Sequence, residues 1–291
     1  MSVSDSIAVL ERRVEEYKSD EKPTWCPGCG DFGVLNALYN TMRNKGWDPK
    51  DIVLVSGIGC SSRLPFFSAT YGFHGVHGRT MPIATGIKVA NPDLKVLAVG
   101  GDGDAFAIGG NHFMHAARRN LDIAYVIMDN SIYGLTKGQT SPTSEVGFVT
   151  KSTPKGNPDQ SVNPLVLAMA SGATFVARAF SGKPKELADI VIKGIDHNGF
   201  AFVDAYSPCP TFNKVNTFKY YREETAELPA DHDPTDKEAA MRIASSVDPL
   251  YLGVIYRATE STSFEEHIKA QQTGSEADAP KVIRDVLRRF S

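Results

Sequence analysis

Short apolar runs alternate with helix-like patterns through the middle of this chain, and this alternation limits the fold more than any other feature. The apolar runs are rich in Val, Ile, Ala and Phe and are bounded by turns, at residues 51–56, 95–100, 123–129, 174–180 and 200–205. Continuous runs of this kind suit strands that are buried on both faces. Helical patterns occupy residues 31–44, 81–90, 104–119, 164–170 and 184–197. This order predicts βαβ crossovers and an α/β fold with a doubly wound, mainly parallel sheet flanked by helices.

Charge and composition exclude several classes of function. The chain has 291 residues and a formal net charge of −3, without a basic block. We therefore expect it to bind neither nucleic acid nor a membrane surface. It also lacks a secretory signal pattern and any apolar stretch of the roughly 18 to 20 residues that span a bilayer. A cytoplasmic protein is expected, in which the four cysteines point to metal binding or redox chemistry rather than to disulfides.

Acidic and amide side chains follow two of the predicted strands. Gly101, Asp102 and Gly103 come directly after the run at 95–100, and Asn130 follows the run at 123–129. Glycine lets the backbone approach a phosphate, and the next helix directs its N-terminal N–H groups at the anion. Mg²⁺ prefers oxygen ligands of this kind, combined with phosphate oxygens. The pattern predicts a magnesium-diphosphate clamp that uses Asp102, Asn130 and a backbone carbonyl, although GDG alone also occurs in ordinary turns.

The cysteines form a second group. Cys26 and Cys29 share a C-P-G-C turn, whereas Cys60 and Cys209 each lie just beyond a predicted strand. Four thiolates suit either tetrahedral zinc or a four-iron cluster. Separate buried thiols are the third interpretation, because free cysteine commonly packs as a small apolar residue. Spacing alone does not choose among these three.

Long motifs in the chain resemble a known family. The spacing of GDG and Asn130 is similar to the thiamine-diphosphate motif of the transketolase and pyruvate-decarboxylase superfamily. The chain also carries WCPGCG at 25–30, GIGCSS at 57–62, HGRTMPIATGIKVANP at 77–92, GGDGDAFAIGGNH at 100–112 and MDNSIYGLTKGQTSPTS at 128–144. Together these resemble the beta subunit of 2-oxoacid:ferredoxin oxidoreductases over roughly residues 23 to 220.

The resemblance implies a set of cofactors and site residues. It implies one [4Fe-4S] cluster held by Cys26, Cys29, Cys60 and Cys209. It implies Mg²⁺ held by Asp102, Asn130 and the carbonyl of Ile132. The residues implied to contact thiamine diphosphate are Ile58, Gly59, Cys60 and Ser61 along the cofactor, His77 near it, Gly103 and Asp104 around the diphosphate, and Gly134 and Leu135 closing over it.

The resemblance also implies a reaction. It is the oxidative decarboxylation of a 2-oxoacid to an acyl-CoA, with coenzyme A as co-substrate and ferredoxin as electron acceptor, or the reverse reductive carboxylation. A partner alpha subunit is expected to supply the glutamate that activates the pyrimidine and the coenzyme A site, in an alpha-beta heterodimer or a dimer of heterodimers. The segment at 207–213, SPCPTFN, looks more like the 2-oxoglutarate branch than the pyruvate branch. Broad-specificity and pyruvate-type enzymes remain alternatives.

Three side chains are candidates for direct catalytic or substrate contact. His77 is one through its match to the family motif. Arg63 and Lys137 are cations near the expected cofactor, and either is able to pair with the distal carboxylate of 2-oxoglutarate. The alternative for both cations is solvated surface charge.

Two other functions are compatible with the residues alone. One is a non-redox thiamine-dependent decarboxylase or synthase subunit with a structural metal site. The other is a zinc-stabilised assembly subunit that binds no thiamine. We expect an N-terminal arm at residues 1–22, a thiamine-diphosphate-binding domain with the iron-sulfur site at 23–220, and a C-terminal extension at 221–291 that makes partner or surface contacts.

Overall fold

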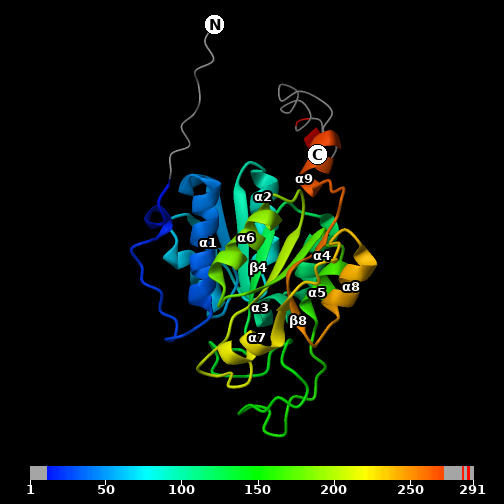
Figure 1. The fold of residues 1–291 in the computed structure, drawn as a ribbon. Coiled ribbons are helices and arrows are strands. Elements are labelled where there is room, and N and C mark those ends of the chain that lie inside the picture. Colours follow the sequence, from blue (N-terminus) through cyan, green and yellow to red (C-terminus); the bar gives the residue numbers. More distant parts are fainter. Residues whose placement is uncertain (1–11, 272–283, 285–286, 289–291) are drawn as a thin grey trace.

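The computed structural model describes residues 12–271, 284 and 287–288. Its centre is an eight-stranded sheet with the strand order β2-β1-β3-β4-β6-β5-β8-β7 (Figure 1). β8 runs antiparallel to β5, and every other pair of neighbouring strands in this sheet is parallel. The strands are β1 (Ile52–Ser56), β2 (Tyr71–His74), β3 (Lys95–Gly101), β4 (Ala124–Asp129), β5 (Phe175–Phe180), β6 (Ala201–Tyr206), β7 (Thr225–Glu227) and β8 (Leu250–Arg257). The predicted α/β fold with a mainly parallel sheet is confirmed.

Helices cover both faces of the sheet. On one face lie α1 (Asp31–Lys45) and α6 (Pro184–Ile195). On the other lie α2 (Thr80–Ala90), α4 (Gly110–Arg119), α5 (Pro164–Ala170) and α8 (Lys237–Ala244). The remaining helices are η1 (Val14–Tyr17), η2 (Pro49–Asp51), η3 (Ser61–Phe67), α3 (Asp102–Phe106), α7 (Phe218–Glu224) and α9 (Phe264–Gln271).

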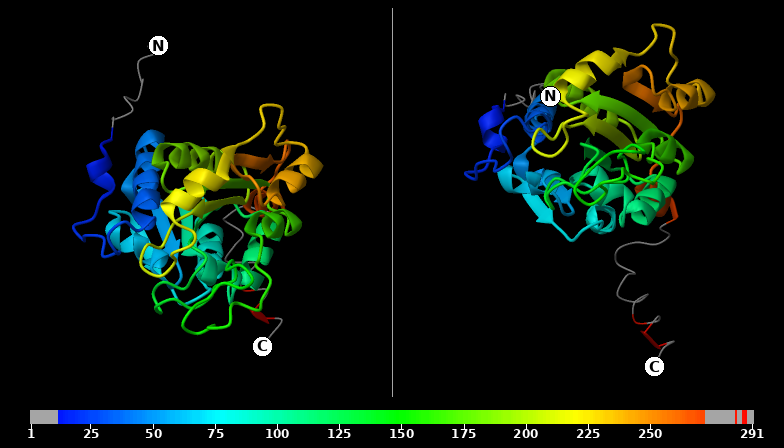
Figure 2. Two further views of the ribbon diagram at one scale, coloured as in Figure 1. Left: turned by 60° about the horizontal axis from the view of Figure 1, so that its bottom comes forward. Right: turned by 90° about the horizontal axis from the view of Figure 1, so that it is seen from below.

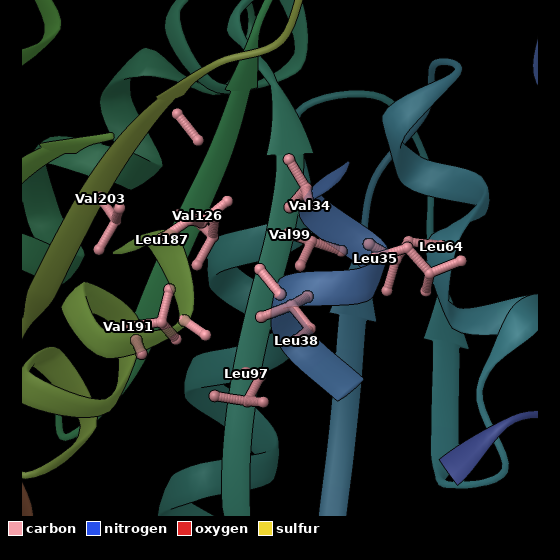
Figure 3. Close-up of a cluster of buried hydrophobic side chains, with 14 of the residues drawn as sticks. Val34, Leu35, Leu38, Leu64, Leu97, Val99, Val126, Leu187, Val191 and Val203 are labelled. Carbon is pink, nitrogen blue, oxygen red and sulfur yellow. The ribbon is translucent and has the colours of Figure 1, made fainter. Parts of the chain in front are cut away.

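Each central strand contributes to two apolar cores, which explains its continuous apolar sequence. Successive side chains of a strand point to opposite faces of the sheet. In β1, Leu54 belongs to the core under α1 and α6, and Val55 belongs to the core on the other face. Figure 3 shows the first core, where Leu38 of α1 lies close to Leu97 of β3.

The helix predicted over residues 104–119 is interrupted, and that prediction was wrong. The chain forms α3, then a turn, then α4. At the turn, a Cβ on Gly109 would lie 2.2 Å from the carbonyl oxygen of Asp104, so only glycine fits at this position. The neighbouring Ile108 packs against Gly78, which lies in a segment far away in the sequence. A contact between segments far apart in the sequence does not change the local spacing of apolar residues, so the helical pattern could not reveal the break.

The expected N-terminal arm packs on the main domain, and the expected C-terminal extension adds strands to the sheet. Tyr17, in the expected N-terminal arm, is fully buried, and its hydroxyl donates hydrogen bonds to the carbonyls of Met42 and Trp47. Strands β7 and β8 of the expected C-terminal extension continue the sheet beyond β5. The division of the chain into three regions stays a prediction. A terminal helix predicted near 279–290 falls almost entirely outside the described residues.

The topology places a crevice at one edge of the sheet. β1 and β3 are neighbours, but the chain leaves β1 towards β2 on one side and leaves β3 towards β4 on the other. Ligands in doubly wound sheets bind at the carboxyl ends of the strands where the connections diverge in this way. The long loop 130–163, green in Figure 1, lies at the same edge, and the right view of Figure 2 looks onto it from below. In the part of the chain that the structure describes, no helix is long and apolar enough to cross a membrane.

Candidate functional site

A cavity of ≈ 370 Å³ opens at the carboxyl ends of β1, β3 and β4. It collects all of the side chains and backbone segments predicted to contact thiamine diphosphate or Mg²⁺. These residues are Ile58, Gly59, Cys60, Ser61, His77, Asp102, Gly103, Asp104, Asn130, Ile132, Gly134 and Leu135. They come from separate stretches of the chain, so the parallel strands rather than sequence proximity bring them together.

Asp102 and Asn130 line this cavity from neighbouring strand ends. Gly101 of β3 is in register with Met128 of β4, so the two residues lie just beyond paired positions. Burial raises the pKa of Asp102 above its usual value, and the neighbouring Asp129 carboxylate raises it further. Buried carboxylates side by side are unfavourable when ionised unless positive charge balances them. A divalent cation bound by oxygen ligands would supply that charge, so the residues present fit Mg²⁺.

Asp104 uses its carboxylate to join two loops of the cavity wall. Its Oδ1 accepts hydrogen bonds from the backbone N–H groups of Ile58, at 2.9 Å, and Gly78, at 2.7 Å. Its Oδ2 accepts a hydrogen bond from the hydroxyl of Thr80 at 2.9 Å. A Cβ on Gly57 would lie only 2.2 Å from this carboxylate, so glycine is required there. Asp104 therefore lies at the cavity, but both of its carboxylate oxygens accept hydrogen bonds that hold the segments following β1 and β2 in place.

His77 lies at the cavity with part of its ring open to solvent. Its Nδ1 is 3.2 Å from Oδ1 of Asp104, and its side chain is 38% exposed. Its ring centroid is 6.1 Å from that of Tyr133, whose hydroxyl donates a hydrogen bond to the carbonyl of Gly103. The carboxylate of Asp104 thus holds the Nδ1 edge of the imidazole, and the rest of the ring stays accessible from the cavity.

Sequence reasoning missed three residues that line the cavity. They are Tyr133, Thr136 and Gln139. Tyr133, Thr136 and Gln139 belong to the loop after β4, where an isolated bridge pairs Tyr133 with Gln139. All three stand inside the long motif at 128–144, which was the only signal that pointed to them.

The three segments that carry the cysteines converge beside the cavity. Trp25, next to Cys26, donates a hydrogen bond from its indole nitrogen to the carbonyl of Cys60 at 2.6 Å. Gly30, next to Cys29, donates from its backbone N–H to the carbonyl of Pro208 at 3.0 Å. A Cβ on Gly134 would lie 3.6 Å from the sulfur of Cys60 and 3.7 Å from that of Cys209. Gly134 and Cys60 both line the cavity, so the thiols of Cys60 and Cys209 lie beside it.

Two of the four thiols, those of Cys29 and Cys60, lie in surroundings that disfavour uncompensated negative charge. All four are free cysteines. Burial raises the pKa of Cys29, and it raises the pKa of Cys60 to about 11. The carboxylate of Asp31 and the neighbouring cysteines add to both shifts. Thiolates are the form that binds metal, so a bound cationic group would remove this penalty, and the donor set fits such a group.

The two cations predicted to contact substrate do not line the cavity. Arg63, on η3, is half-buried, and its charge acts to lower the pKa of Cys60 against the larger effect of burial. Lys137 is exposed and has a φ of 77°, in a turn in which its N–H donates to the carbonyl of Gly134. Both stand near the cysteines or the loop over the cavity. Their role as substrate contacts stays a prediction.

Comparison with known proteins gives consistent matches. Residues 57–205 match the family model "Thiamine pyrophosphate enzyme, C-terminal TPP binding domain", and residues 209–273 match the model for the C-terminal part of the pyruvate ferredoxin oxidoreductase beta subunit. The chain is 42% identical to the 2-oxoacid:ferredoxin oxidoreductase subunit beta of Saccharolobus solfataricus, over 88% of each chain. It is 49% identical to the 2-oxoglutarate oxidoreductase subunit KorB of Mycobacterium tuberculosis, over 73% of this chain and 57% of the relative.

A solved structure agrees with these matches. It is the 2-oxoglutarate:ferredoxin oxidoreductase from Magnetococcus marinus with 2-oxoglutarate, coenzyme A and succinyl-CoA bound. The TM-score is 0.89 at 43% identity, and the match covers 94% of this chain and 96% of that chain. Sequence motifs, sheet topology and relatives of similar length point to one assignment. The chain belongs to the family of beta subunits of 2-oxoacid:ferredoxin oxidoreductases and carries its thiamine-pyrophosphate-binding domain.

Proposed function

We propose that this beta subunit binds thiamine diphosphate and Mg²⁺ in the cavity at the ends of β1, β3 and β4. The observation that carries the proposal is the common cavity, because residues expected to contact one cofactor from several separate segments all line it. Asp102, Asn130 and the carbonyl of Ile132 would hold the metal, and Gly103 would allow the diphosphate to approach the backbone. When bound, thiamine diphosphate supplies a nucleophilic carbon and takes up the electrons left as carbon dioxide departs.

The cysteines are proposed to hold one [4Fe-4S] cluster, which would accept electrons one at a time. Support comes from the convergence of the three cysteine segments and from the position of Gly134 next to two of the sulfurs. The residues proposed to hold the cluster are Cys26, Cys29, Cys60 and Cys209.

2-Oxoglutarate is the proposed substrate, with coenzyme A and ferredoxin as co-substrates. The relative from Mycobacterium tuberculosis acts on 2-oxoglutarate by name, and the structure from Magnetococcus marinus has 2-oxoglutarate and coenzyme A bound. A beta subunit implies an alpha subunit, which we propose supplies the glutamate for the pyrimidine and the coenzyme A site. Arg63 or Lys137 would pair with the distal carboxylate of the substrate.

His77 is proposed to hold or release a proton beside the substrate. Its Nδ1 faces the buried carboxylate of Asp104 at 3.2 Å, which fixes the orientation of the ring. Its partial exposure at the cavity leaves it within reach of a bound molecule. Imidazole is the side chain best suited to proton transfer near neutral pH.

The test is to purify the chain together with its alpha subunit and to measure cofactors and products. We expect about four irons per beta chain, heat on titration with thiamine diphosphate and Mg²⁺, and formation of succinyl-CoA coupled to reduction of ferredoxin. Pyruvate and 2-oxobutyrate serve as competing substrates. A colourless protein that contains zinc would refute the cluster, and carbon dioxide release without an electron acceptor would indicate a non-redox thiamine enzyme. No heat with the cofactor would refute the cavity assignment.

A further inference from the structure

A buried hydroxyl lies directly behind the proposed magnesium site, and the proposed function leaves it without a role. Thr143 belongs to the long loop 130–163 and is 7% exposed. Its hydroxyl oxygen is 2.8 Å from Oδ2 of Asp102 and 2.8 Å from Oδ1 of Asp129. Both distances lie in the hydrogen-bond range, and the one hydroxyl proton is shared between the two carboxylates unless one of them is protonated. Thr143 therefore connects a proposed metal ligand to the last residue of β4.

The far end of this connection is itself fixed. Oδ1 of Asp129 also accepts a hydrogen bond from the backbone N–H of Ser131 at 2.9 Å. Asp129 is 2% exposed and belongs to a central strand. The contact with Asp129 therefore fixes the position of the Thr143 hydroxyl relative to the sheet. The contact of the same hydroxyl with Asp102 then restrains the Asp102 carboxylate.

The next residue of the loop supports the other two proposed ligands. Ser144 is fully buried, and its hydroxyl donates a hydrogen bond to the carbonyl of Ser131 at 2.7 Å. Ser131 has a φ of 53°, in the left-handed region that residues other than glycine rarely adopt. Such a conformation persists only where the surroundings hold it. Because Ser131 stands between Asn130 and Ile132, its backbone conformation sets the direction of both.

We propose that Thr143 and Ser144 are positioning residues for the magnesium site. Thr143 orients the carboxylate of Asp102, and Ser144 fixes the backbone between Asn130 and Ile132. The inference rests on the proposed function, since it takes these three residues as the metal ligands. Hydrogen-bonding partners of metal ligands commonly set both the direction of the ligand and the affinity for the metal. The loop 130–163 therefore contributes to the site from behind as well as over the cavity.

The test measures metal affinity in the assembled enzyme with its alpha subunit. Mn²⁺ replaces Mg²⁺ after chelation, with thiamine diphosphate at saturation, and electron paramagnetic resonance reports free Mn²⁺. We expect Thr143→Val, which keeps the shape of the side chain, to weaken Mn²⁺ binding roughly 10- to 100-fold. Thr143→Ser restores the hydroxyl and should bind close to the wild type. The control is Thr150→Val, since the hydroxyl of Thr150 in the same loop contacts only Ser152 and Thr153 among the hydrogen bonds found for it.

A second measurement separates a specific effect on the magnesium site from a general loss of folded or active enzyme. The KM for Mg²⁺ should rise in Thr143→Val while kcat at saturating Mg²⁺ changes little. Ser144→Ala tests the other half of the proposal and is expected to weaken Mn²⁺ binding even if Thr143→Val fails to assemble. Wild-type affinity in both variants, with affinity lost in Asp102→Asn, would overturn the inference and leave the proposed function intact. Equal Mn²⁺ binding by the wild type and Asp102→Asn would instead refute the proposed metal site, and the inference with it.

Discussion

Replacing Asp104 by alanine should separate the two loops that form one wall of the cavity. The carboxylate accepts hydrogen bonds from Ile58, Gly78 and Thr80, and its side chain is 1% exposed. Alanine leaves two buried donors, on Gly78 and Thr80, and the half-buried N–H of Ile58 without an acceptor, and each buried donor left unpaired costs about 1–3 kcal/mol. Because neighbouring bonds are not additive, we expect a loss of about 3–6 kcal/mol in the free energy of unfolding. That corresponds to a melting temperature lower by on the order of 10 °C.

Asp104→Asn is the graded variant for this prediction. Asparagine keeps one carbonyl oxygen for the two backbone donors and places its amide opposite the hydroxyl of Thr80, which is able to turn and accept. The cost should therefore be only about 1–2 kcal/mol. Circular dichroism of the cofactor-free assembled enzyme gives the melting temperatures, and calorimetry gives the affinity for thiamine diphosphate. Asp93→Ala, at an exposed site, is the control. The reasoning is wrong if Asp104→Ala melts and binds the cofactor as this control does.

Three further predictions concern the proposed cofactors and substrate. Cys209→Ser should remove most of the roughly four irons expected per chain, as measured by iron analysis and visible absorbance. Leu135 is 50% exposed at the cavity, and Leu135→Ala should weaken thiamine diphosphate binding by about 1 kcal/mol, roughly fivefold, in calorimetric titration. Arg63→Ala or Lys137→Ala should raise the KM for 2-oxoglutarate about tenfold or more, by loss of a charge-assisted hydrogen bond. The KM for 2-oxobutyrate, which lacks the distal carboxylate, should stay unchanged, and an equal rise for both substrates would exclude the residue as a carboxylate contact.

Features that depend on local pattern could be predicted from the sequence. The central strands have both faces buried, so their composition alone reveals them. Asp102 and Asn130 were expected to meet because parallel strands bring their carboxyl ends to one edge. The two residues do line the same cavity there. Strand β2 was missed because it is an edge strand in which Tyr71 and Phe73 are exposed, so it has no continuous apolar run of buried residues.

Features that depend on contacts between distant segments could not be predicted. The break between α3 and α4 places Ile108 against Gly78, a contact that no local window of the sequence contains. Thr143 gave no individual signal either, since threonine is ordinary in a polar loop. Its proposed role became visible only when its hydroxyl was found between Asp102 and Asp129. Arg63 and Lys137 were chosen by charge and chain position, and charge does not report where a long side chain points.

Gly134 limits how this protein can change over time. Gly134 lines the cavity and lies beside the sulfurs of Cys60 and Cys209, and Cys60 lines the same cavity. A Cβ on Gly134 would lie 3.6 and 3.7 Å from the two sulfurs, which is ordinary van der Waals contact, so alanine fits there. A longer side chain would need space that the sulfurs or the cavity occupy. The surroundings of the cysteines and the shape of the cavity are therefore linked at this residue, and a change that enlarges it acts on both.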